Sequence, residues 1–112
     1  MHELAICRAI IDHVEARAEG RAVQRVEVRI GHFRQVVPDS LQFSWTVLTD
    51  GTDLSDCHLL INYVPAVIRC ACGAESVLDV PIPACMTCGG VDVEFLSGNE
   101  FDVAWIEVAE AS

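Results

Sequence analysis

Four of the six cysteines in this chain of 112 residues lie in two short pairs that could hold a metal ion. Cys70 and Cys72 form the first pair, Cys85 and Cys88 form the second, and a glycine follows each pair. Thiolate sulfurs from two such turns can surround one Zn(II) tetrahedrally at about 2.3 Å. The spacing of the second pair is typical of a zinc knuckle, because the glycine permits the tight backbone bend on which both sulfurs converge. The pattern predicts a four-cysteine zinc site.

The first pair is one residue shorter than the second, as Cys70-x-Cys72. Residues two apart in an extended backbone point the same way, so both sulfurs can still reach one metal. Four thiolates leave no open coordination position, which predicts a structural zinc site and not a catalytic one. A redox-labile dithiol pair and a rubredoxin-like iron site on the same sulfurs remain alternatives. The remaining cysteines, Cys7 and Cys57, are predicted to be unpaired residues of the core or of a loop.

A second potential metal site lies at the N-terminus, in Met1, His2 and Glu3. A free α-amine, deprotonated backbone amides and an imidazole can form a planar set of four nitrogens. Square-planar nitrogen coordination suits Ni(II) or Cu(II). The bulky His2 side chain is expected to hinder removal of Met1, so that the amine of Met1 is retained. A histidine at position 2 does not by itself predict a metal site.

Two amphipathic segments predict helices. The first runs from His2 to Glu19, followed by Gly20, with an apolar stripe at spacings of three and four residues: Leu4, Cys7, Ile11, Val14 and Ala18. The second begins at Pro38 and runs to about Thr49, with its core stripe at Leu41, Trp45 and Leu48. Phe43 and Val47 lie toward the opposite side of that helix, and we expect a deeply packed helix there in preference to a partner surface.

Three segments alternate or concentrate β-forming residues and predict strands: 23–30, 59–64 and about 101–108. The expected fold class is α+β, with two helices packed on a small three-stranded sheet and an inserted zinc-ribbon-like four-cysteine subdomain. The expected domains are residues 1–66 plus 98–112, and residues 67–97 as the zinc-binding subdomain. That subdomain has too few large apolar side chains for a core of its own, so metal binding is expected to replace hydrophobic burial.

The composition excludes several classes of function. The net charge is −10, from 17 acidic residues and seven arginines. Such a surface repels phosphate backbones and anionic lipids, so neither nucleic acid nor a membrane is an expected partner. No apolar run approaches the roughly 18 residues of a membrane span, and no basic leader precedes an apolar segment. We therefore expect a cytoplasmic protein with reduced cysteines. No nucleophile–base pair or phosphate-binding glycine loop suggests an enzyme.

Several short motifs together resemble one known family, the HypA/HybF hydrogenase maturation (nickel incorporation) proteins, over essentially the whole chain. The motifs are Met1-His2-Glu3-Leu4, Ile30-Gly31, Pro38 at the start of a helix, the paired cysteines and Gly98-Asn99-Glu100. The resemblance implies a nickel metallochaperone that delivers Ni(II) to the large subunit of [NiFe]-hydrogenase and works with a nickel-handling GTPase accessory protein. It further implies nickel ligation through His2, the Met1 amine and nearby backbone nitrogens such as that of Glu3, with Zn(II) on the four cysteines.

The sequence departs from the family pattern at two places. The family usually has Cys-x-x-Cys where this chain has Cys70-x-Cys72, and an acidic residue where it has Val37. Asp39 and His32 are candidates for a further nickel ligand, although His32 is also compatible with an ordinary loop histidine. Two functions outside nickel transfer remain possible on sequence: a zinc-ribbon adaptor whose N-terminus binds nothing, and an electron-transfer protein with iron on four cysteines.

Overall fold

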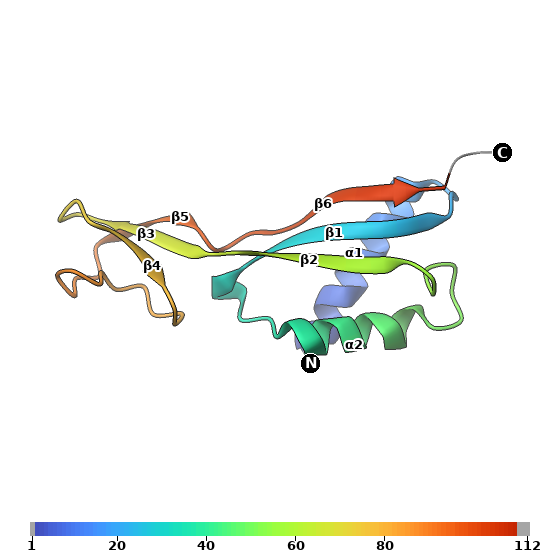
Figure 1. The fold of residues 1–112 in the computed structure, drawn as a ribbon, viewed down its shortest axis with the longest axis horizontal. Coiled ribbons are helices and arrows are strands. Elements are labelled where there is room, and N and C mark those ends of the chain that lie inside the picture. The colour runs from blue at the N-terminus through green and yellow to red at the C-terminus, as the bar shows by residue number, and fades with distance from the viewer. Residues whose placement is uncertain (1, 110–112) are drawn as a thin grey trace. The chain divides into compact units, whose positions relative to one another are not determined.

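The computed structural model describes residues 2–109, in which the chain forms two compact units (Figure 1). Unit 1 contains residues 2–28, 36–62 and 102–109, and unit 2 contains residues 29–35 and 63–101. The domain boundaries expected from the sequence, 1–66 plus 98–112 and 67–97, stay a prediction. No helix among the described residues has the length and apolar character that crossing a membrane requires.

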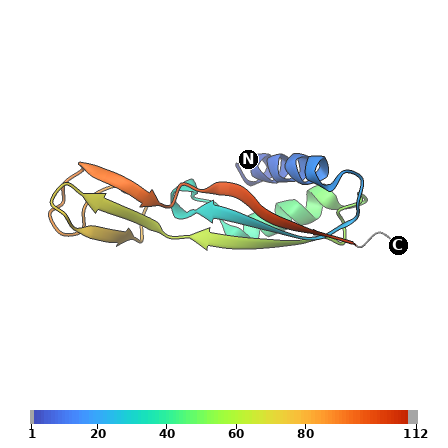
Figure 2. The same cartoon turned by 90° about the horizontal axis from the view of Figure 1, so that it is seen from above.

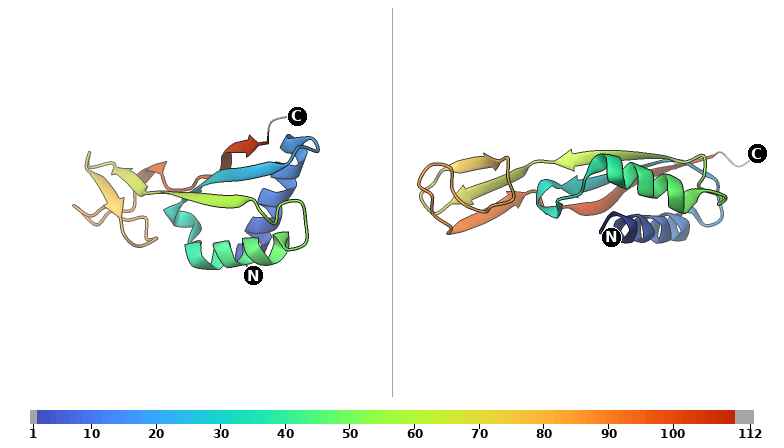
Figure 3. Two further views of the ribbon diagram at one scale, coloured as in Figure 1. Left: turned by 45° about the vertical axis from the view of Figure 1, so that its right-hand side comes forward. Right: turned by 90° about the horizontal axis from the view of Figure 1, so that it is seen from below.

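Unit 1 is built on the predicted three-stranded sheet. Its order is β2-β1-β6, with β1 at Val23–Gly31, β2 at His58–Val64 and β6 at Phe101–Val108. The arrows of β1 and β2 point the same way and that of β6 points the opposite way (Figure 2). Helix α1, His2–Ala18, crosses the sheet, and helix α2, Pro38–Thr49, runs alongside it and packs against α1 (Figures 1 and 3). The α+β fold class expected from the sequence is confirmed.

The core of unit 1 follows the predicted periodicities. Helix α1 buries Cys7, Ile10, Ile11, Val14 and Ala18, which is the predicted stripe with Ile10 added and with Leu4 only half-buried. Strand β1 buries alternate residues, because one face of the strand meets the helices and the other meets solvent.

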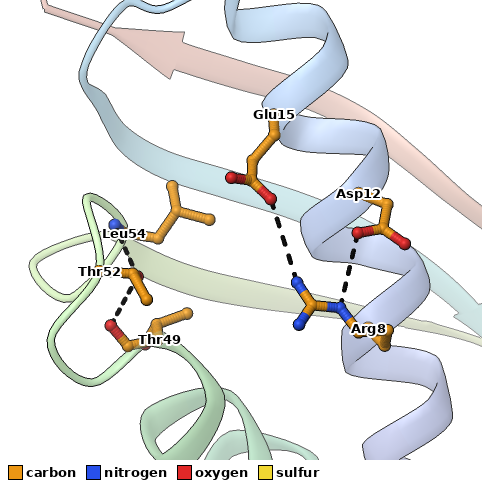
Figure 4. Close-up of polar contacts among 6 residues, drawn as sticks. All are labelled: Arg8, Asp12, Glu15, Thr49, Thr52 and Leu54. Carbon is orange, nitrogen blue, oxygen red and sulfur yellow. Dashed lines mark hydrogen bonds and ion pairs between the residues drawn. The ribbon is translucent and has the colours of Figure 1, made fainter.

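Helix α2 is fixed to the start of β2 by two side chains. The Trp45 indole donates to the carbonyl of Cys57 at 3.0 Å, and the Gln42 amide donates to that of Leu59 at 2.6 Å. The turn after the helix is held by a Thr52 hydroxyl that donates to the carbonyl of Thr49 at 2.7 Å and accepts from the backbone N–H of Leu54 at 3.1 Å (Figure 4).

Charged side chains on α1 add little to this framework. Arg8 lies 3.5 Å from Asp12 and 4.0 Å from Glu15, and all three side chains are more than half exposed (Figure 4). Exposed ion pairs of this kind contribute about 0–1 kcal/mol, so burial on the opposite side of the helix fixes its position.

The outer face of α2 differs from expectation. Phe43 is 70% exposed and Val47 is 51% exposed, so the interpretation of α2 as a deeply packed helix is wrong. The helical period explains the result, since both side chains lie about half a turn away from the buried Leu41 and Trp45.

Unit 2 contains a second three-stranded sheet that was not predicted from the sequence. Its order is β4-β3-β5, with β3 at Ala66–Cys70, β4 at Glu75–Leu78 and β5 at Val93–Ser97, and both pairings are antiparallel. The sheet buries Ala66, Ile68 and Leu78, with Phe33 and Val93 packed against them.

The expectation that residues 67–97 have no core therefore needs correction, because unit 2 contains a small one. Phe33 reaches it from a distant part of the sequence and makes an edge-to-face contact with Phe95, with ring centroids 5.0 Å apart. A metal on the four cysteines would then supplement this burial instead of replacing it.

Two glycines in unit 2 meet at a close backbone crossing. Gly31 ends β1 and precedes a short 3-10 helix at His32–Arg34, where we expected a loop. A Cβ on Gly31 would overlap the carbonyl group of Gly98, and a Cβ on Gly98 would lie 2.7 Å from Cα of Ala66. The backbone N–H of Gly31 donates to the carbonyl of Glu100 at 2.7 Å, and that of Phe33 donates to the carbonyl of Gly98 at 2.8 Å. The Ile30-Gly31 and Gly98-Asn99-Glu100 motifs thus have one structural cause.

Candidate metal centre

The four paired cysteines bring their sulfurs together in unit 2. All four Sγ atoms lie within 4.8 Å of one another. The sulfurs of Cys70 and Cys88 are 3.6 Å apart, and those of Cys72 and Cys85 are 3.7 Å apart. These separations are too long for disulfides, and all four are free thiols. Ligands at about 2.3 Å from a tetrahedral Zn(II) would lie about 3.8 Å apart, so the donor set fits the ion that the spacing predicts.

Two tight turns place these sulfurs. Cys70 ends β3, and the turn that carries Cys72 closes where the N–H of Gly73 donates to the carbonyl of Cys70 at 2.8 Å. In the second turn the N–H of Gly89 donates to the carbonyl of Cys85 at 2.9 Å. Gly73 and Gly89 have φ angles of +92° and +74°, in the region that favours glycine. The shortened Cys70-x-Cys72 pair therefore reaches the site from the end of a strand.

Backbone N–H groups surround the sulfurs of the second turn. Cys85 Sγ accepts from the N–H groups of Cys88 at 3.4 Å and Thr87 at 3.3 Å, and these bonds lower the pKa of the Cys85 thiol from 9.0 to about 6. The N–H of Gly90 donates to Cys88 Sγ at 3.4 Å. Such bonds favour the thiolate, the form that ligates metal.

Cys70 behaves differently from Cys85. The backbone N–H of Cys72 acts to lower the pKa of Cys70, but desolvation and the neighbouring thiols outweigh it and raise that pKa to about 12. The four sulfurs form a group that could hold a metal ion, whose positive charge would offset the repulsion between neighbouring thiolates.

Two residues that support the site were not identified from the sequence. Ser76 on β4 is buried, and its hydroxyl accepts from the backbone N–H of Met86 at 3.2 Å, which ties the second turn to the sheet. A Cβ on Gly90 would lie 3.2 Å from Cys88 Sγ. The spacing of the cysteines gives no sign of Ser76, because it acts through a strand that was not predicted, and Gly90 lies in the loop just after Cys88.

The other two cysteines lie in unit 1 and are buried free thiols, as predicted. Desolvation, with a smaller contribution from Glu3, raises the pKa of Cys7 to about 11. Desolvation raises that of Cys57 to about 11 as well. Both therefore stay protonated at neutral pH and serve as apolar core residues.

At the other predicted site, His2 is the first residue of α1 and is exposed, and Glu3 follows half-buried in the first turn. Met1 lies outside the described residues. Asp39 is an exposed residue in the first turn of α2, in unit 1, whereas half-buried His32 belongs to the 3-10 helix of unit 2.

Comparisons with known proteins agree with this architecture. Residues 1–108 match the family model described as "Hydrogenase/urease nickel incorporation, metallochaperone, hypA". The hydrogenase maturation factor HypA of Desulfosudis oleivorans is 36% identical over 98% of this chain and 100% of its own length. That of Geotalea uraniireducens is 38% identical over 96% of this chain and 99% of its own length. The solution structure of the Ni metallochaperone HypA from Helicobacter pylori superposes with a TM-score of 0.66 at 20% identity, over 96% of this chain and 97% of the other, which shows a shared fold.

Proposed function

The chain belongs to the HypA family of nickel incorporation metallochaperones, and on that basis we propose that it binds Ni(II) at its N-terminus and delivers it to the large subunit of [NiFe]-hydrogenase. The protein is then a maturation factor and not an enzyme. The observation that carries this assignment is the match of the family model across residues 1–108, together with a cluster of four cysteine sulfurs that could supply four ligands to one metal ion.

The sulfur cluster supports a structural role for Zn(II) on Cys70, Cys72, Cys85 and Cys88. Four thiolates complete a tetrahedral shell, so the ion keeps no position for exchange with a partner. Bound zinc would neutralise the crowded thiolates and hold the two turns together. Because a tetrathiolate persists in a reducing compartment, the proposal includes a cytoplasmic location.

A cargo ion needs a different site, and the start of α1 supports one. The proposed ligands are the Met1 amine, the His2 imidazole and the backbone nitrogens of His2 and Glu3. The first N–H groups of a helix have no acceptor within the helix, so the hydrogen-bond ladder of α1 does not use these nitrogens. His2 is exposed, so that a metal ion at the start of α1 can reach its side chain.

The decisive experiment is a Ni(II) titration of zinc-loaded protein with its native N-terminus, compared with the same chain extended by Gly-Ser before Met1. The extension converts the Met1 amine into a peptide nitrogen and leaves every described side chain unchanged. We expect one planar Ni(II) in the native protein, with its characteristic absorption, and none in the extended protein, at equal zinc content. Equal affinity and the same planar spectrum in both proteins would contradict N-terminal ligation.

Three substitutions separate backbone from side-chain ligation. His2→Ala should abolish planar nickel binding, and Glu3→Ala should have a mild effect because it keeps the backbone nitrogen. Glu3→Pro should be severe, since proline has no N–H to deprotonate, although the first turn of a helix tolerates proline. Metal analysis tests the alternatives: stoichiometric iron would indicate electron transfer, and zinc without any nickel binding would indicate an adaptor.

The nickel-handling GTPase is the second partner in this proposal. Its association and that of the hydrogenase large subunit can be measured on the same nickel-loaded protein. Neither nucleic acid nor a membrane enters the proposal, in keeping with the net charge of −10.

A further inference from the structure

The outer face of α2 carries a line of four exposed side chains. Asp39, Phe43, Val47 and Asp50 follow one another at spacings of four, four and three residues, which places them along one side of the helix and its C-terminal cap. We call these four residues the α2 stripe. Its two central side chains are apolar and largely exposed, and its two ends are carboxylates.

Phe43 is the most informative member of the stripe. Its side chain is 70% exposed and contributes little to the core, because α2 packs through Leu41 and Trp45 on the opposite side. Phenylalanine is usually buried, and exposed aromatic side chains next to a second apolar residue are typical anchors of protein interfaces. The spacing of Phe43 and Val47 is that of a helix face which enters a groove on a partner.

The chain segment that contains the stripe is acidic, which limits what it can bind. Between Gln35 and Ile68 the sequence has four aspartates and neither lysine nor arginine. All four aspartates are exposed: Asp39, Asp50, Asp53 and Asp56. An acidic partner surface would be repelled, whereas lysines and arginines around an apolar groove would be attracted from a distance.

The position of α2 within unit 1 links the stripe to nickel. The Cys7 thiol on α1 lies 3.5 Å from the carbonyl oxygen of Leu41, so the second turn of α1 packs on the first turn of α2. Figures 1 and 3 agree that α1 starts beside α2. A protein docked on the stripe would therefore contact the helix that packs against the α1 end carrying the proposed nickel ligands.

We propose that the α2 stripe is the docking surface for the protein that accepts nickel, the nickel-free hydrogenase large subunit, through an apolar groove rimmed by lysine or arginine. The inference rests on the proposed function, since it presumes transfer from the N-terminus. Phe43 and Val47 anchor the complex, and Asp39 and Asp50 steer the basic rim toward them.

The test measures binding of nickel-loaded protein to the purified nickel-free large subunit from the same organism. Phe43→Ser/Val47→Ser removes both anchors, and both sites are exposed, so the fold should persist. Val77→Ser/Val91→Ser is the matched control, because these valines of unit 2 are 62% and 78% exposed. We expect the Kd to rise at least about tenfold for the first variant and less than about twofold for the control. Asp39→Asn/Asp50→Asn should slow association and weaken its dependence on salt.

Nickel titration of the same variants separates the two proposals. If the anchor variant binds nickel as the wild type does but no longer binds the large subunit, the result supports the stripe. If the wild type itself binds no nickel, the result contradicts the proposed function. The stripe proposal is overturned if the anchor variant keeps the wild-type Kd for the large subunit, or if the wild type does not bind it. It is also overturned if the anchor variant loses only GTPase binding, or only self-association seen by ultracentrifugation, because another occupant then covers the stripe.

Discussion

Replacing Gly31 with alanine should destabilise unit 2 by about 2–6 kcal/mol. Gly31 has φ −75° and ψ 148°, an extended conformation that any residue adopts, so the requirement for glycine is steric alone. An alanine Cβ would overlap the carbonyl group of Gly98 and the nitrogen of Asn99, which are backbone atoms that cannot rotate away. Overpacking of this kind costs about 1–3 kcal/mol.

The same shift would weaken two hydrogen bonds at the crossing. These are the 2.7 Å bond from Gly31 to Glu100 and the 2.8 Å bond from Phe33 to Gly98. Each contributes about 0.5–1.5 kcal/mol, which brings the total to the stated range. Phe33 would also lose its alignment on Phe95 and on the small core.

The matched control is Gly51→Ala. Gly51 has φ +74°, and a Cβ added to it would meet no atom within 4 Å, so alanine there should cost only the left-handed strain of about 1–2 kcal/mol. Urea unfolding of the zinc-loaded proteins gives the free energies, and hydrogen exchange at the Phe33 amide reports the crossing itself. If Gly31→Ala is no more destabilising than Gly51→Ala, and the Phe33 amide keeps its protection, the steric argument is wrong.

Three further results are expected. Cys85→Ser and Cys88→Ser should lose zinc and make unit 2 more sensitive to protease, and Cys70→Ser should have a milder effect. Zinc content and limited proteolysis measure both changes. Wild-type values in all three variants would contradict this prediction. Nickel affinity should rise by about tenfold or more from about pH 6 to about pH 7.5, because protons compete for amine and imidazole nitrogens; a flat profile in titrations across this range would indicate carboxylate ligands instead. In the metal-free protein, the N–H groups of Cys88 and Thr87 hold the pKa of Cys85 at about 6, below its ordinary 9.0. The free energy of unfolding that is due to the Cys85 thiolate is therefore complete above pH 9 and is lost as the pH falls through about 6. Urea unfolding should show this loss in the wild type and not in Cys85→Ser.

The sequence was sufficient to predict the elements whose stability is local or periodic. Helix α2 begins at Pro38 and ends at Thr49 as expected, because proline suits a first turn and Leu41 and Trp45 mark the buried side. Strand β6 has the bounds that were predicted for it, since phenylalanine, tryptophan, valine and isoleucine recur along it.

The second sheet could not be predicted in this way. Strands β3, β4 and β5 have only four or five residues each, and their core depends on Phe33, more than 30 residues away in the sequence. A periodic pattern over such short segments does not distinguish a strand from a turn. The sequence also could not show that the sulfur of Cys70 lies beside that of Cys88, and the sulfur of Cys72 beside that of Cys85. The spacing of the cysteines indicates a shared metal but not which sulfurs are neighbours.

The sequence also does not predict whether the second face of a helix is buried. Helical periodicity places Phe43 and Val47 opposite the buried stripe of α2, but it does not say whether another element covers them. Their exposure became evident only with the packing of α1 on the other side.

The two metals in this proposal have opposite requirements, and the chain meets them with different chemistry. Zinc must be retained, and four sulfurs on two closed turns, with backbone N–H groups directed at Cys85 and Cys88, form a saturated shell. Nickel must be released, and nitrogen donors at a chain end lose the metal when they are protonated or when a partner supplies better ligands. Because His2 lies in unit 1 and the four cysteines in unit 2, transfer of the cargo need not disturb the zinc ion proposed for the second unit. A docking surface for the acceptor is therefore expected in unit 1, where the α2 stripe lies.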